Sequence, residues 1–157
     1  MPLPRYETRV RPEWIDSNGH MNLAYYIVVF DHATDRAYEA LDIGTSYRAR
    51  TGDSSFVVET HTLYEQEVNE GEPVVVTTRL LGVDAKRLHF VHEMHHGVSH
   101  ARLALHELMC VHIDMATRRT APWPADTRAA LEAAVAAESM LPVPRGVGRR
   151  VGQKRET

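Results

Sequence analysis

The stretch WIDSNGHMN at residues 14–22 carries side chains that could catalyse attack on a carbonyl group. An acid, two amides and a histidine occupy alternate positions, as Asp16, Asn18, His20 and Asn22. A carboxylate can activate water or act as a nucleophile, and amide and imidazole groups can hydrogen-bond a substrate. An Asn18-Gly19 turn before a helix cap explains the amides and the glycine, but not Asp16 and His20 together. The residues alone leave both interpretations open.

A long amphipathic helix is predicted directly after this turn. Apolar residues recur at steps of three and four: Leu23, Tyr26, Ile27, Phe30, Thr34, Ala37 and Leu41. Asn22 suits an N-cap, and Gly44 suits a stop. Because the first turn of a helix has unpaired N–H groups and a positive end, we expect an oxyanion hole there with Gly19 or His20.

The rest of the chain is predicted to form a sheet and a second helix. A strand is expected at residues 6–14, and four more at 55–68, 72–84, 86–96 and 101–114, separated by turn signals. The short links favour an antiparallel meander. Residues 124–141 are typical of a helix capped by Asp126. We expect the sheet to wrap around the first helix, since no other segment can cover it.

The length of 157 residues suits one domain over residues 1–140, followed by an irregular basic tail at 141–157. The net charge is −3, and the tail contributes +4, which leaves −7 for the body. The one acidic residue of the tail is Glu156, and its basic residues are Arg145, Arg149, Arg150, Lys154 and Arg155. Such a tail is usually a solvated, frayed terminus, and a nucleic-acid partner is not expected.

Cys110 is the single cysteine, so an internal disulfide is not possible, and its apolar surroundings favour a buried, inert thiol. The first residues lack the apolar segment of a signal peptide, and no stretch has the length of a membrane span. We therefore expect a cytoplasmic protein that has no membrane partner.

The segment HEMHH at residues 92–96 matches the zinc-protease motif H-E-x-x-H, but a metal site is not expected. In those proteases the two histidines share one face of a helix. Here Phe90, Val91 and Gly97 favour a strand, on which His92 and His96 would lie about 13 Å apart. The histidines of the predicted strands are therefore expected to face solvent.

The turn, the long helix and the meander together resemble the hotdog-fold acyl-CoA thioesterases of the hydroxybenzoyl-CoA thioesterase-like superfamily. Those enzymes carry a D-x-N-x-H-V-N-N-type turn at the head of the central helix, and Asp16, Asn18, His20 and Asn22 fall in register with it. The resemblance implies an α+β hotdog fold, and a homodimer or homotetramer with its site between subunits. It also implies hydrolysis of an acyl-CoA, in which coenzyme A belongs to the substrate and no cofactor is needed.

Two further segments extend the resemblance. LYEQEV is similar to a segment of acyl-ACP thioesterases that contributes an acidic catalytic residue, which would be Glu67. WIDSNGHMN, FVVETH and DAKRLH look most like the betainyl-CoA thioesterases, which implies betainyl-CoA as substrate and a place in carnitine breakdown. Other short acyl groups, a hydratase and a non-catalytic acyl-CoA-binding protein remain alternatives.

The chain departs from the founding branch of that superfamily at one position. The branch has its catalytic aspartate five residues before the turn glycine, where Trp14 stands here. The covalent mechanism of the branch is therefore not carried over. We expect water attack assisted by Asp16.

Further binding residues are predicted near the turn and on the second strand. Glu59, His61 and Glu67 would share a strand face and approach the loop of a neighbouring subunit, although a solvated face explains them equally well. Trp14 and Tyr25 offer aromatic faces for a trimethylammonium group.

Lys86 and Arg87, at the predicted turn DAKRLH, suit the phosphates of coenzyme A. An ordinary charged hairpin turn is the alternative.

Overall fold

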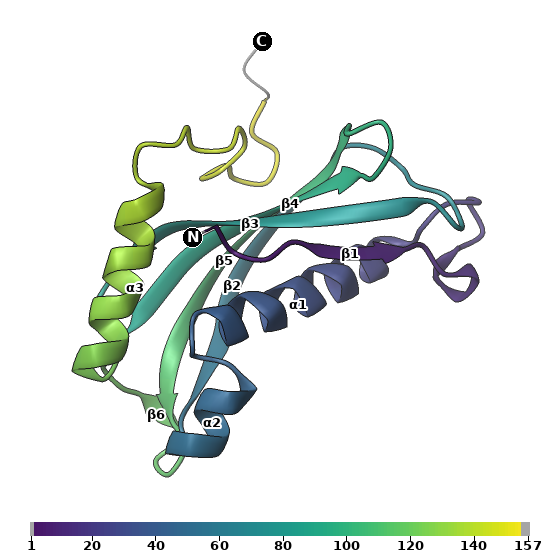
Figure 1. Ribbon diagram of the computed structural model, residues 1–157. Coiled ribbons are helices and arrows are strands. Elements are labelled where there is room, and N and C mark those ends of the chain that lie inside the picture. The colour runs from purple at the N-terminus through teal and green to yellow at the C-terminus, as the bar shows by residue number, and fades with distance from the viewer. Residues whose placement is uncertain (1, 155–157) are drawn as a thin grey trace.

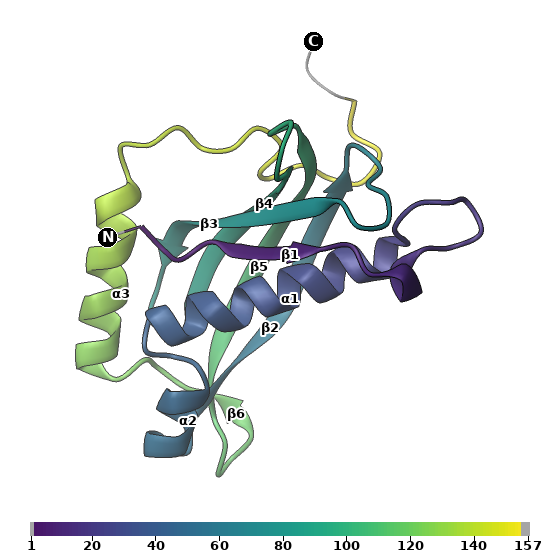
Figure 2. The ribbon, with the colours of Figure 1, turned by 45° about the vertical axis from the view of Figure 1, so that its right-hand side comes forward.

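The computed structural model describes residues 2–154, in which a curved antiparallel sheet wraps around one long helix (Figures 1 and 2). The strands are β1 (Tyr6–Arg9), β2 (Ser54–Tyr64), β3 (Pro73–Val83), β4 (Arg87–His96), β5 (Arg102–Asp114) and β6 (Arg119–Thr120). The helices are α1 (Leu23–Ala40), α2 (Thr45–Thr51) and α3 (Ala125–Glu138), and a 3-10 turn spans Pro12–Trp14. This arrangement confirms the predicted α+β hotdog fold.

The sheet has the strand order β1-β3-β4-β5-β2, with β6 paired to the end of β5. The predicted meander is correct for β3, β4 and β5, but β2 pairs with β5 at the outer edge. The link from β2 to β3 crosses the start of α1, where Val68 is fully buried and its carbonyl accepts the Met21 N–H at 2.9 Å. This long-range contact separates two strands that are neighbours in sequence.

Predicted element boundaries are wrong at the first strand, at the end of α1 and at the start of α3. The first strand ends at Arg9, because the 3-10 turn begins at Pro12. Gly44 does not end α1 but precedes α2, which the sequence analysis missed; the Glu39 carboxylate accepts the Ser46 N–H there at 3.0 Å. Asp126 is not the cap of α3, since Pro124 occupies that position and Asp126 lies in the first turn.

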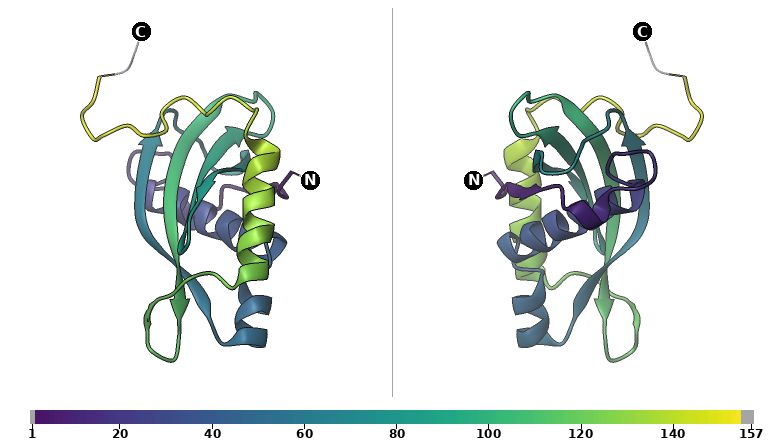
Figure 3. Two further views of the ribbon diagram at one scale, coloured as in Figure 1. Left: turned by 90° about the vertical axis from the view of Figure 1, so that its left-hand side faces the viewer. Right: turned by 90° about the vertical axis from the view of Figure 1, so that its right-hand side faces the viewer.

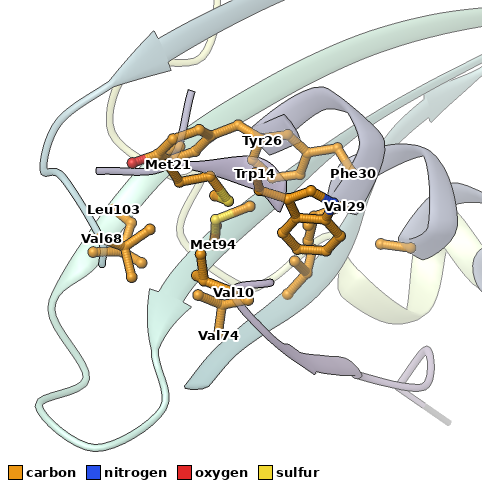
Figure 4. Close-up of a cluster of buried hydrophobic side chains, with 13 residues drawn as sticks. Val10, Trp14, Met21, Tyr26, Val29, Phe30, Val68, Val74, Met94 and Leu103 are labelled. Atoms are coloured by element: carbon orange, nitrogen blue, oxygen red, sulfur yellow. The ribbon is translucent and has the colours of Figure 1, made fainter. Parts of the chain in front are cut away.

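The buried face of α1 packs onto the concave side of the sheet. Its buried residues are Tyr26, Val29, Phe30, Ala33, Thr34, Ala37 and Tyr38. Figure 4 shows the cluster at the start of the helix, where the sulfur atoms of Met21 and Met94 lie between Tyr26 and the valines of the sheet. None of the helices in residues 2–154 is long and apolar enough to cross a membrane.

Three histidines are buried, so the prediction of solvent-facing histidines is wrong for His92, His106 and His112. His92 is completely buried and His106 almost so, and their rings stack on Phe30 at centroid distances of 5.9 and 4.7 Å. The Thr34 hydroxyl donates to the Phe30 carbonyl and therefore accepts from Nε2 of His92 at 2.8 Å. The Thr78 hydroxyl then donates to Nδ1 of His92 at 2.8 Å, so this network holds a neutral imidazole.

We expect the free energy of unfolding to fall as the pH drops from about 6.5 towards 4. Burial, together with the neighbouring His106, lowers the pKa of His92 from 6.5 to about 3, and burial lowers that of His106 to about 4. Between these values and 6.5 the unfolded chain binds protons that the native state does not. For each histidine the free energy of unfolding should then fall by about 1.4 kcal/mol per pH unit. Urea unfolding at several pH values would measure this slope.

A variant comparison isolates this effect. His106→Leu should flatten the pH dependence, whereas His100→Asn, at an exposed turn position, should leave it unchanged. Stability that stays constant from pH 6.5 to 5 would contradict the assignment of neutral buried imidazoles.

Candidate active site

The predicted polar turn closes on itself at the start of α1. The backbone N–H of Asp16 donates to the His20 carbonyl at 3.2 Å, and the N–H of Gly19 donates to the Asp16 carbonyl at 3.0 Å. Gly19 has φ +81°, a conformation that glycine adopts without strain. The Asn22 N–H donates to the Trp14 carbonyl at 2.9 Å, which pins the turn against the core.

The Asp16 carboxylate is held inside this turn by both of its oxygens. Oδ1 accepts the Asn18 N–H at 2.8 Å, and Oδ2 accepts Nδ2 of Asn22 at 3.0 Å. The Asn18 N–H, and then the Asn22 side chain, lower the pKa of Asp16. Asp16 is therefore a stable carboxylate and a weak proton acceptor, which suits a role in holding the turn.

A cavity of about 380 Å³ lies between this turn and the segment that follows β2. Asp16, Asn18, His20 and Glu67 all line it, so the structure brings together the four side chains predicted to be catalytic. Nε2 of His20 lies 3.8 Å from Oε2 of Glu67, and the Glu67 side chain is 68% exposed.

Of the two N–H groups predicted as oxyanion donors, those of Gly19 and His20, only that of His20 has no protein acceptor among the hydrogen bonds of residues 2–154. The Gly19 N–H is paired within the turn, so the prediction that it serves as an oxyanion donor is wrong. The side chain of Asn22 accepts the Ala24 N–H at 2.9 Å, which confirms Asn22 as the N-cap. Among the hydrogen bonds of residues 2–154, neither the His20 N–H nor the Leu23 N–H has a protein acceptor. Both residues line the cavity, at the positive end of α1.

The aromatic rings predicted to bind substrate lie elsewhere. Trp14 is buried between the stacked ring of Tyr25, at 5.7 Å, and the guanidinium of Arg11, at 5.3 Å. Neither Trp14 nor Tyr25 lines the cavity; Tyr26 and Tyr64 do, with their rings edge to face at 5.3 Å.

The hydroxyl of Tyr26 donates to the Gln66 carbonyl at 2.9 Å, and burial raises the pKa of this phenol to about 12. Tyr64 was not among the predicted site residues, although it belongs to the LYEQEV segment that contains Glu67.

The predicted common strand face of Glu59, His61 and Glu67 is wrong. β2 ends at Tyr64, and the N–H groups of Glu65 and Gln66 both donate to the Leu103 carbonyl, at 2.8 and 3.1 Å. The chain bends there, so Glu67 lines the turn cavity, whereas Glu59 and His61 line a separate cavity on the other face of the sheet.

Lys86 lies between β3 and β4, and Arg87 begins β4, at the end of β3 that is remote from its pairing with β1. Arg87 is paired with Asp84 at 2.7 Å, and neither Lys86 nor Arg87 lines the turn cavity of its own chain. The structure therefore leaves them apart from the four residues at the turn.

The sequence of the chain is similar to those of known proteins over most of its length. The model of the thioesterase-like superfamily matches residues 10–131. A betainyl-CoA thioesterase of Pseudomonas aeruginosa is 43% identical over 150 residues, which cover 96% of this chain and 94% of that protein. An L-carnitine dehydrogenase/betainyl-CoA thioesterase of Rhizobium meliloti is 34% identical over 98% of this chain, but the match spans only 31% of that longer protein.

Solved structures share the fold over nearly the whole chain. A hypothetical protein from Staphylococcus aureus, in complex with CoA, has a TM-score of 0.89 and 23% identity, covering 98% of this chain and 96% of its own. A proposed thioesterase from Pseudomonas putida KT2440 has a TM-score of 0.81 and 31% identity, covering 98% and 99% of the two chains.

Proposed function

The chain belongs to the thioesterase-like superfamily, and from that membership we propose that it hydrolyses betainyl-CoA to the free acid and coenzyme A. The observation that carries the proposal is the cavity that joins the Asp16–Asn22 turn to Glu67 at the start of α1. A relative named for this substrate matches almost end to end, which supports the choice of acyl group.

The carbonyl oxygen of the thioester binds at the N-terminus of α1. The N–H groups of His20 and Leu23 donate to it, and the helix end stabilises the negative charge that forms when water adds to the carbonyl carbon. The C–S bond then breaks, the sulfur leaves as the thiol of coenzyme A after gaining the proton that the base took from the water, and the acid is released.

Glu67 takes the proton from the attacking water in this mechanism. Its carboxylate is open to the cavity and faces His20, which holds the water from the other side. Asp16 is a positioning residue, because both of its oxygens are used to hold Asn18 and Asn22. This assignment moves the base from Asp16, where the sequence analysis had it, to Glu67.

A second copy of the chain completes the site. β2 is an outer strand, and apolar side chains are exposed along it and on the adjoining side of α1: Leu23, Ile27, Val28, Phe56, Val57, Val58 and Tyr64. An exposed edge strand with apolar neighbours is a surface that proteins normally cover. If the β2 strands of two subunits pair in antiparallel fashion, the start of β2 in one subunit lies next to the end of β2 in the other. The end of β2 is beside the turn cavity, so each subunit would place its β2 start at the cavity of its partner.

The acyl group is tested by comparing betainyl-CoA with 3,3-dimethylbutyryl-CoA, a neutral compound of the same shape. The exposed ring of Tyr64 and the carboxylate of Glu67 favour the trimethylammonium cation. One such ring contact contributes about 1–2 kcal/mol, so kcat/KM should be roughly five- to thirtyfold higher for betainyl-CoA. Equal values would leave a thioesterase of other specificity, and binding of CoA thioesters without CoA release would favour a non-catalytic protein.

Glu67→Gln should lower kcat by about two to four orders of magnitude, the range for a lost general base. Asp16→Asn should also lower kcat, but by less, because the asparagine amide has a single oxygen and cannot replace both the Oδ1 contact with Asn18 and the Oδ2 contact with Asn22. Glu70→Gln, in the exposed turn before β3, is the matched control. Near-normal turnover by Glu67→Gln would return the role of base to Asp16.

Light scattering should show a dimer whose dissociation removes activity. Val58 is 59% exposed on β2, so Val58→Arg introduces a charge at the proposed contact and should yield an inactive monomer. Val98→Arg, at a 72% exposed position between β4 and β5, should remain an active dimer. An active monomer of the unmodified chain would refute the requirement for two copies.

A further inference from the structure

The basic segment after α3 is held in place, although its composition is typical of a frayed terminus. Residues 142–154 contain no helix or strand, yet they cross the face of the sheet opposite α1 (Figures 1 and 3). Nη2 of Arg102 donates to the Arg145 carbonyl at 2.8 Å, and the Gly148 N–H donates to Oε2 of Glu107 at 2.7 Å. The interpretation of the tail as a frayed terminus is therefore wrong for residues 142–154, and residues 155–157 lie outside the described part of the chain.

Gly146 fixes how closely this segment approaches the sheet. It has φ +105°, and a Cβ there would lie 2.8 Å from the Leu63 side chain and 2.9 Å from that of Leu105. A larger residue would push the segment outward. The basic side chains on either side of Gly146 consequently have defined positions over β2 and β5.

A cavity of about 250 Å³ lies between the segment and the sheet, and its charged lining is mostly positive. Arg102, Arg145, Arg149 and Lys154 line it, with Glu65 as the one carboxylate. Oε1 of Glu65 is already paired with Arg102 at 2.6 Å. The cavity therefore presents cations whose charge this carboxylate does not balance.

These cations have no carboxylate partners within the described part of the chain. No described Asp or Glu lies within ion-pair distance of Arg145, Arg149, Arg150 or Lys154. Nε of Arg149 is in addition buried with no hydrogen-bond partner. A buried guanidinium donor without an acceptor is costly, and Arg149 also lines the positive cavity.

The positive cavity adjoins the turn cavity, because Glu65 lines both. On this basis we propose that residues 145–154 bind the phosphates of coenzyme A, an inference that rests on the proposed thioester hydrolysis. The 3′-phosphate and the pyrophosphate together carry about four negative charges. They are joined to the thioester by the pantetheine arm, so a thioester at the turn and phosphates at the segment belong to one ligand.

The test compares two substrates that differ only in the nucleotide. A triple variant, Arg149→Ala, Arg150→Ala and Lys154→Ala, is assayed with an acyl-CoA and with the corresponding acyl-pantetheine, which lacks all three phosphates. The ratio of kcat/KM for acyl-CoA to that for acyl-pantetheine should fall roughly ten- to a hundredfold in this variant. Arg119→Ala, which removes one positive charge from exposed β6, should leave the ratio unchanged.

Other outcomes separate this inference from the proposed function. An unchanged ratio in the triple variant, with a reduced ratio in Lys86→Ala, would place the phosphates at the β3–β4 turn and overturn the inference. An equal loss with both substrates would also overturn it, since the variant would have disturbed the turn cavity itself. Unmodified protein that neither hydrolyses the thioester nor binds CoA by calorimetry would instead refute the proposed function.

Discussion

The side chain of Asn22 couples the start of the long helix to the turn that precedes it. Its Oδ1 accepts the Ala24 N–H, and its Nδ2 donates to Asp16. An N-cap of this kind contributes about 1 kcal/mol to stability, and here it also fixes the geometry of the turn. Because one amide binds both partners, the carboxylate of Asp16 and the unpaired N–H groups of the helix keep a constant relative position. The proposed oxyanion site depends on that arrangement.

The position of Glu67 in the site depends on how β2 ends. The bend after Tyr64, made by two N–H groups on the Leu103 carbonyl, turns Glu67 towards His20. Val68 then anchors the link in the core, where its carbonyl accepts the Met21 N–H. Since β2 is also the outer strand, the elements that bring Glu67 to the site are the ones that a second subunit would cover.

Local patterns in the sequence predicted the elements that local contacts stabilise. The three-to-four residue period predicted α1, and Asn22 caps it as expected, because a cap and its acceptor lie within two residues. The short links between the segments of β3, β4 and β5 correctly predicted the two hairpins that these strands form. The outer position of β2 could not be predicted, because it follows from the burial of Val68, a contact between segments distant in sequence.

The errors at single residues have a similar origin. His92 is polar, so its burial depends on Thr34 and Thr78, which lie on other elements. Trp14 belongs to the polar turn in sequence, but Tyr25 and Arg11 cover its faces. For the four residues predicted to be catalytic, the register of the motif indicated Asp16, Asn18 and His20, while Glu67 came only from resemblance. Its approach to His20 required the bend that ends β2.

The distribution of charge gives the basic segment a role that its composition alone does not suggest. The body of the chain carries −7, and a coenzyme A thioester is itself an anion, so long-range electrostatics oppose their encounter. The segment concentrates +4 on the face of the sheet that adjoins the turn cavity. A local positive field of this kind would attract the phosphates of the substrate to the proposed site. Because Glu65 lines both cavities, one extended ligand could place a cationic acyl group near Glu67 and its phosphates near Arg149, as proposed above.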